Sequence, residues 1–112
     1  MLILFDQGTP IGIRDHLQGH TVRTAREQGW STLSNGELLR AAEDAGFDLL
    51  LTTDKNLPYQ QNLTKFKISI VMLGATRWSL IQRRLQQIAN AVNGAKPGTY
   101  TFVEIPQKQS SG

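Results

Sequence analysis

Two aspartates follow segments that are predicted to be buried strands. Asp6 comes directly after the apolar residues 1–5, and Asp54 comes after residues 47–53. If these strands are neighbours at the point where the strand order of a parallel sheet reverses, both carboxylates lie at its functional edge. Like charges at that separation repel unless a cation lies between them, and hard divalent cations prefer oxygen ligands. The pair therefore predicts a Mg²⁺ or Mn²⁺ site; the alternative is two turn or capping aspartates.

Glu37 is the third candidate, as a metal ligand or as the base that orients a water. It also stands at the last position of an S-x-x-E capping box that begins at Ser34. At about 100° per residue, the apolar face of this helix centres near Ala42, with Asn35 close to it and Glu37 more than a quarter turn away. Asn35 is therefore expected to point more directly towards the sheet edge, and both roles of Glu37 stay open.

Other polar side chains are candidates for orienting a substrate. The amides in this group, besides Asn35, are Gln7, Asn56 and Gln60. The candidate contacts to a nucleic-acid backbone are Lys55, Lys65, Lys67, Arg77, Arg83 and Arg84. The alternative for all of them is that they are ordinary solvated loop and helix residues.

The elements that must position these residues alternate along the chain. Apolar or β-branched segments at 1–5, 20–25, 47–53, 68–73 and 99–105 predict strands. Helices are predicted after Thr9, as an N-cap followed by Pro10, then from the capping box at Ser34, shortly after Leu57, and over 77–93, where apolar residues recur at steps of three and four. Alternation of this kind predicts an α/β fold: a three-layer α/β/α sandwich with a mainly parallel sheet of about five strands.

The 112 residues correspond to one domain, predicted to cover 1–106, with a disordered polar tail at 107–112. Hydrophobic residues make up 39%, which is enough for a core. The chain has no cysteine, which excludes disulfides, thiolate metal sites and thiol nucleophiles. No apolar run reaches the roughly 18 residues of a membrane helix, and no signal peptide is visible, so a cytoplasmic protein without membrane contact is expected.

The formal net charge of +3 conceals two opposite halves. Residues 1–56 carry −3 and residues 57–112 carry +6. The acidic half supplies the candidate metal ligands, and the basic half is weakly indicative of a polyanionic partner.

These residues carry a family resemblance. The chain resembles the PIN-like nuclease superfamily, in its short single-domain bacterial branch, at four places in order: residues 6–10 (DQGTP), 19–22 (GHTV), 34–39 (SNGELL) and 52–57 (TTDKNL). The match covers about residues 1–75. The resemblance implies a PIN-like fold and a Mg²⁺- or Mn²⁺-dependent endoribonuclease with an RNA substrate. It further implies the toxin of a toxin–antitoxin pair, with a small antitoxin protein as partner, and a homodimer.

The sequence also departs from that family. Gln7, Asn35 and Asn56 stand where the family has acids, whereas Asp6, Glu37 and Asp54 remain. A two-metal site normally uses more carboxylates. The chain is therefore a one-metal enzyme, a nuclease with altered ligands, or an inactive relative that binds RNA or a partner protein.

A further alternative is a degenerate phospho-receiver domain. That class shares the size and the aspartates after strands one and three, and Thr76 follows strand four. The usual second acid after strand one is missing, however, and Lys96 precedes the last strand rather than following it.

Overall fold

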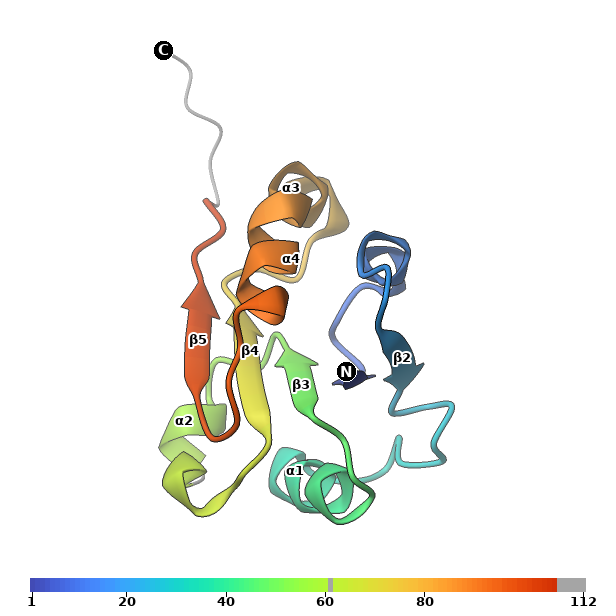
Figure 1. Ribbon diagram of the computed structural model, residues 1–112, viewed down its shortest axis with the longest axis vertical. Coiled ribbons are helices and arrows are strands. Elements are labelled where there is room, and N and C mark those ends of the chain that lie inside the picture. The colour runs from blue at the N-terminus through green and yellow to red at the C-terminus, as the bar shows by residue number, and fades with distance from the viewer. Residues whose placement is uncertain (61, 107–112) are drawn as a thin grey trace.

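A computed structural model describes residues 1–60 and 62–106 of the chain (Figure 1). The tail predicted at 107–112 lies outside the described residues, as do the side chains of Tyr59 and Gln60. Five strands form one sheet: β1 (Leu2–Phe5), β2 (Thr21–Thr24), β3 (Leu49–Thr52), β4 (Ser69–Leu73) and β5 (Tyr100–Val103). Each lies inside the range that its residues predict.

The sheet is parallel throughout, in the order β2-β1-β3-β4-β5. The strand order reverses between β1 and β3. β2 lies on one side of β1, whereas β3 and the strands that follow it lie on the other side. Ligand sites of open parallel sheets lie beyond the carboxyl ends of the strands at such a point. The α/β class and the juxtaposition of the first and third strands are confirmed.

The helical segments are mostly short. They are η1 (Ile11–His16, 3₁₀), α1 (Asn35–Asp44), α2 (Leu57–Gln60), η2 (Leu63–Lys65, 3₁₀), α3 (Trp78–Ile81), η3 (Gln82–Arg84, 3₁₀) and α4 (Leu85–Asn93). The capping box at the start of α1 is present as predicted, with the Ser34 hydroxyl accepting from the Glu37 N–H. Gly46, just beyond α1, has a φ of +87°, the left-handed conformation that glycine adopts without strain.

The single helix predicted over 77–93 is wrong. A 3₁₀ turn at η3 separates α3 from α4, and Arg84 leaves helical geometry at φ −121° and ψ 21°. Ile81, Ile88 and Val92 are nonetheless all buried. The helical spacing of the apolar residues therefore continues across η3, which is why the sequence periodicity does not reveal the break between α3 and α4. Trp78, the first residue of α3, remains 38% exposed.

The predicted N-cap role of Thr9 is also wrong. Pro10 is the residue before η1, and no side chain caps it. The Thr9 hydroxyl is instead buried between Oδ1 of Asp6, at 2.6 Å, and the carbonyl oxygen of Leu51, at 2.9 Å.

Two apolar cores lie on the two faces of the sheet. Ile3, Phe5 and the buried residues of α3 and α4 belong to one, whereas Leu4 and the buried residues of α1 belong to the other. Figure 1 shows α3 and α4 together in orange, well apart from α1 and α2 in green. Since β1 is buried on both faces, the residue that follows it is held at a fixed position.

Within the described part of the chain, no helix is long and apolar enough to span a membrane.

Candidate functional site

A cleft of about 330 Å³ lies at the carboxyl ends of β1 and β3, where the strand order reverses. Its polar lining consists of Asp6, Gln7, Ser31, Asn35, Thr53 and Asp54, and Trp30 is its largest apolar side chain. The topology thus brings the two predicted aspartates and Asn35 to one cavity, from three separate segments of the chain.

Asp6 is 7% exposed, and its carboxylate is held by two threonines. Thr9 donates to Oδ1 at 2.6 Å, and the Thr52 hydroxyl donates to Oδ2. The Asp6 N–H donates to the carbonyl oxygen of Leu51 at 3.3 Å, which continues the β1–β3 pairing by one residue. Burial of a carboxylate is costly unless donors surround it, so the two hydroxyls make this position tolerable for an acid.

Asp54 is half-buried and organises the loop after β3. Its Oδ1 accepts from the Asn56 N–H at 3.0 Å, and its Oδ2 accepts from the side-chain amide of Asn35. The Asp54 N–H donates to the Thr52 hydroxyl oxygen at 3.1 Å. Thr52 therefore links both aspartates, because the same hydroxyl that accepts from Asp54 donates to Asp6.

Glu37 does not line the cleft. It is exposed, and its Oε1 accepts from the Ser34 N–H at 3.0 Å. This backbone hydrogen bond, with a second from the Ser34 side chain, lowers the pKa of Glu37 below its ordinary value of 4.5. The capping interpretation of Glu37 is confirmed, and its role at a metal stays a prediction. Asn35 lies on a different side of α1 from Glu37. It lines the cleft, as the helical wheel predicts.

The turn after β1 approaches the turn after β3 very closely. A Cβ atom on Gly8 would lie 2.5 Å from Oγ1 of Thr53, so a larger residue there would require the Thr53 side chain or the turn to shift. The side-chain amide of Gln7 donates to the carbonyl oxygen of Ser31 and thereby ties this turn to the loop after β2. Gln7 thus lines the cleft and at the same time braces its wall.

Trp30 is a cleft residue for which the sequence alone offers no support as a site residue. Its indole is half-buried and packs edge-to-face on Phe47, with ring centroids 5.9 Å apart and planes inclined at 64°. The backbone N–H of Trp30 donates to the carbonyl oxygen of Ala25 at 2.8 Å. The available signal is a large aromatic residue in a polar loop outside any helical stripe.

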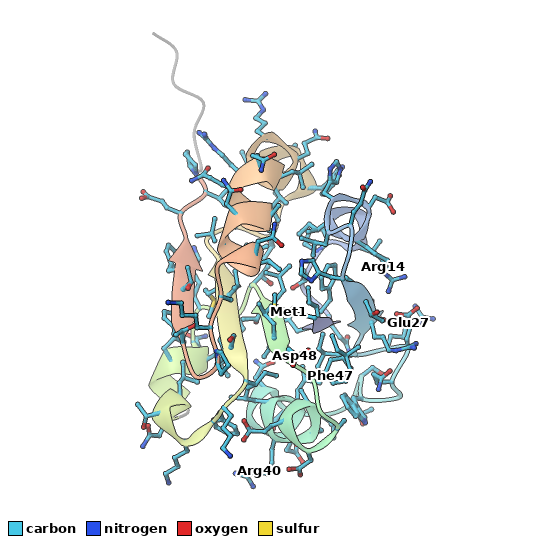
Figure 2. All side chains as sticks on the ribbon, in the orientation of Figure 1. Met1, Arg14, Glu27, Arg40, Phe47 and Asp48 are labelled. Atoms are coloured by element: carbon cyan, nitrogen blue, oxygen red, sulfur yellow. The ribbon has the colours of Figure 1, made fainter. Side chains whose placement is uncertain are left out.

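A second hollow adjoins the cleft and shares Asp6, Gln7, Ala25 and Ser31 with it. Arg26 lines this hollow and is exposed. Arg26 is not a site candidate from the sequence, because a single arginine in a polar loop forms no distinguishing pattern. The neighbouring Glu27 forms an ion pair with Arg14 at 2.5 Å, and Figure 2 shows these two side chains together beside β2.

The predicted basic contacts are scattered. Lys55 follows Asp54 and is exposed, and Arg77 precedes α3 after β4, so both belong to the carboxyl edge of the sheet. Lys65 and Lys67 precede β4 and therefore belong to its opposite edge, where Lys67 lines a separate hollow. The remaining two, Arg83 and Arg84, are exposed in η3.

Of the two remaining predicted amides, Asn56 is not among the described cleft residues. Asn56 is exposed and contributes its backbone N–H to Asp54. The side chain of Gln60 lies outside the described residues.

The described lining of the cleft contains two carboxylates and no lysine, arginine or histidine. Its donor set of carboxylate, amide and hydroxyl oxygens suits a hard divalent cation. Among residues 1–60 and 62–106, no group of three or more acids and histidines is arranged to hold a metal. The fit is therefore to a cation that takes two protein carboxylates and draws its remaining ligands from neutral oxygens or water.

The chain matches no protein-family model, no curated protein and no solved structure at a significant level. The resemblance to PIN-like nucleases, with the homodimer and the antitoxin partner that it implies, therefore stays a prediction.

Proposed function

We propose that this chain is a Mg²⁺- or Mn²⁺-dependent ribonuclease whose reaction takes place in the cleft between the ends of β1 and β3. The observation that supports this proposal is the pairing of Asp6 and Asp54 in one cavity whose described lining has no basic side chain. Two carboxylates without a cationic neighbour attract a cation. They also make the cleft unsuitable for a phosphate unless a metal is present.

In this proposal the protein groups have distinct tasks. Asp6 and Asp54 would hold the metal, and the Thr9 and Thr52 hydroxyls keep the Asp6 carboxylate in place. Asn35 orients Asp54 through its amide. The bound Mg²⁺ or Mn²⁺ would lower the pKa of a water and neutralise charge on the attacked phosphate. Glu37 is engaged at the start of α1, so the proposal does not depend on it as a ligand or base.

A second candidate is an inactive PIN-like module that binds RNA or a partner protein. The observation that favours it is that both Asp6 carboxylate oxygens already accept from hydroxyl donors, in a cleft whose described lining holds two acids. Each carboxylate oxygen has a further lone pair, so these bonds leave room for a metal, and we rank the nuclease first. The phospho-receiver alternative is weaker, because Lys96 lies before β5, at the edge of the sheet remote from Asp54.

The experiment compares cleavage of a structured RNA with and without Mn²⁺ by the wild type, Asp6→Asn and Asp54→Asn. Asp44→Asn is the matched control, since Asp44 is exposed at the end of α1. We expect Mn²⁺-dependent cleavage that falls at least 100-fold in both site variants and is unchanged in the control. Equal activity of all four proteins, or inertness of the wild type, contradicts the nuclease. Metal-independent RNA binding by an inert wild type favours the binding module.

A further inference from the structure

Trp30 lies beside the two carboxylates without any part in holding them. Its indole packs on Phe47 and joins the margin of the core beneath α1, but the core leaves part of it uncovered, and that part lines the cleft. A half-buried aromatic ring at the wall of a polar cavity offers an apolar surface to whatever enters.

The loop that carries Trp30 is fixed at several points. Backbone hydrogen bonds join Trp30 to Ala25, at 2.8 Å, and Leu33 to Trp30, at 3.1 Å. The Gln7 side chain bonds the carbonyl oxygen of Ser31, the residue next to Trp30. The edge-to-face contact with Phe47 then fixes the ring itself. The indole surface is therefore already in place before a ligand arrives, which reduces the cost of ordering it.

The groups that line the cleft indicate which kind of molecule could contact all of them at once. Under the proposed function, the end with Asp6 and Asp54 would hold a metal and hence a phosphate, and the wall formed by Trp30 would accept a flat ring. The Ser31 hydroxyl and the Asn35 amide, also in the lining, offer hydrogen bonds to ring edges. A volume of about 330 Å³ is at the small end of ligand cavities. It suits one nucleotide whose base is unpaired.

We propose that Trp30 is the stacking surface for one unpaired base of single-stranded RNA, next to the phosphate at the Asp6–Asp54 end of the cleft. This inference rests on the proposed function for its substrate class. It makes the enzyme selective for single strands, because a base inside a duplex is not free to leave its own stack.

The test uses fluorescence of Trp30 in the Trp78→Phe background, in which Trp30 is the only tryptophan of the chain. The probe is a ten-nucleotide oligoadenylate, compared with the same oligomer carrying abasic sites, in Ca²⁺. We expect quenching of Trp30 and binding that is about 5- to 100-fold tighter for the base-bearing oligomer, as one stacked base provides. Trp30→Leu should remove this preference and Trp30→Phe should retain most of it, with the binding of these tryptophan-free variants followed by the anisotropy of the same oligomers carrying a fluorescent label.

Equal binding of both oligomers by a folded wild type overturns the stacking site. If Mn²⁺-dependent cleavage persists alongside that result, the nuclease stands without Trp30. If the base preference is present but no divalent cation supports cleavage, the stacking site stands and the nuclease fails. Thermal melting of Trp30→Leu accompanies the binding data, and Trp30→Phe supplies the readout should the leucine variant not fold.

Discussion

The side-chain amide of Asn35 donates a hydrogen bond to Oδ2 of Asp54, nineteen residues further along the chain. This contact ties the first turn of α1 to the loop after β3 and closes one side of the cleft. It also places a neutral group where a third carboxylate would complete a stronger metal site.

Asn35→Asp should therefore raise the affinity for Mn²⁺ by about tenfold or more, since a third charged oxygen ligand is added beside Asp54. Isothermal titration with Mn²⁺ measures this. Asn35→Ala is the control, because it removes the amide without adding charge and should not bind Mn²⁺ more tightly than the wild type. An unchanged affinity in Asn35→Asp would argue against a cation at this position.

Gly8→Ala should destabilise the protein by about 1–3 kcal/mol, because the new Cβ collides with Oγ1 of Thr53. The double variant Gly8→Ala/Thr53→Ala removes the colliding oxygen, and the next atoms lie at 3.8 Å or more. Urea unfolding of the four proteins of this cycle should show a favourable coupling of about 1 kcal/mol. Strictly additive effects would mean that the two turns do not meet as described.

Glu37→Gln should leave Mn²⁺-dependent cleavage intact if the role of Glu37 is confined to the capping box, since glutamine also serves at that position. Ser34→Ala, which removes the cap itself, should cost about 1 kcal/mol of stability and likewise spare the cleft. Loss of cleavage in a folded Glu37→Gln protein would instead make Glu37 a ligand or base.

The stability difference between the wild type and Glu37→Gln should depend on pH. The folded-state pKa of Glu37 is lowered, because its ionised carboxylate accepts from the Ser34 N–H and hydroxyl. The charged cap therefore stabilises the fold above the ordinary pKa of 4.5, and this contribution disappears as the pH falls through the lowered value. Urea midpoints of the wild type and Glu37→Gln should differ at neutral pH and converge in acid. A gap that widens in acid would contradict the sign.

Arg26→Ala should weaken binding of single-stranded RNA and reduce the salt slope of log K by about one, because Arg26 lines the hollow next to Asp6. Arg40→Ala is the matched control. Arg40 is exposed on α1, and Figure 2 shows it on the outer side of that helix. Equal slopes for both variants would place the RNA backbone elsewhere on the surface.

The elements that carry local signals were predictable from the sequence. The apolar segments around Leu4, Leu50 and Val71 have no alternative to burial in a sheet, and Ser34 with Glu37 marks the start of α1 unambiguously. The position of Asp6 and Asp54 followed from strand order alone, since the carboxyl ends of parallel strands share one edge.

The parts that could not be predicted depend on contacts across the chain. Thr9 looked like a cap because its sequence neighbour is Pro10, yet the buried carboxylate of Asp6 competes for the same hydroxyl. Trp30 belongs to no periodic apolar pattern in the sequence. Its place in the cleft depends on how its loop folds and on the packing of its ring on Phe47, a contact between distant residues. Arg26 gained its place from the loop geometry around Ser31, which no local pattern encodes.

The central place of β1 has a consequence for how the chain folds during synthesis. Residues 2–5 leave the ribosome before β3, which ends at residue 52, so the two edges of β1 are both paired only after residue 52 has been synthesised. Until then Ile3, Leu4 and Phe5 remain exposed in an extended segment that favours association with other chains. Nascent fragments that stop before β3 should therefore require chaperones, whereas fragments that include β4 should begin to fold unaided.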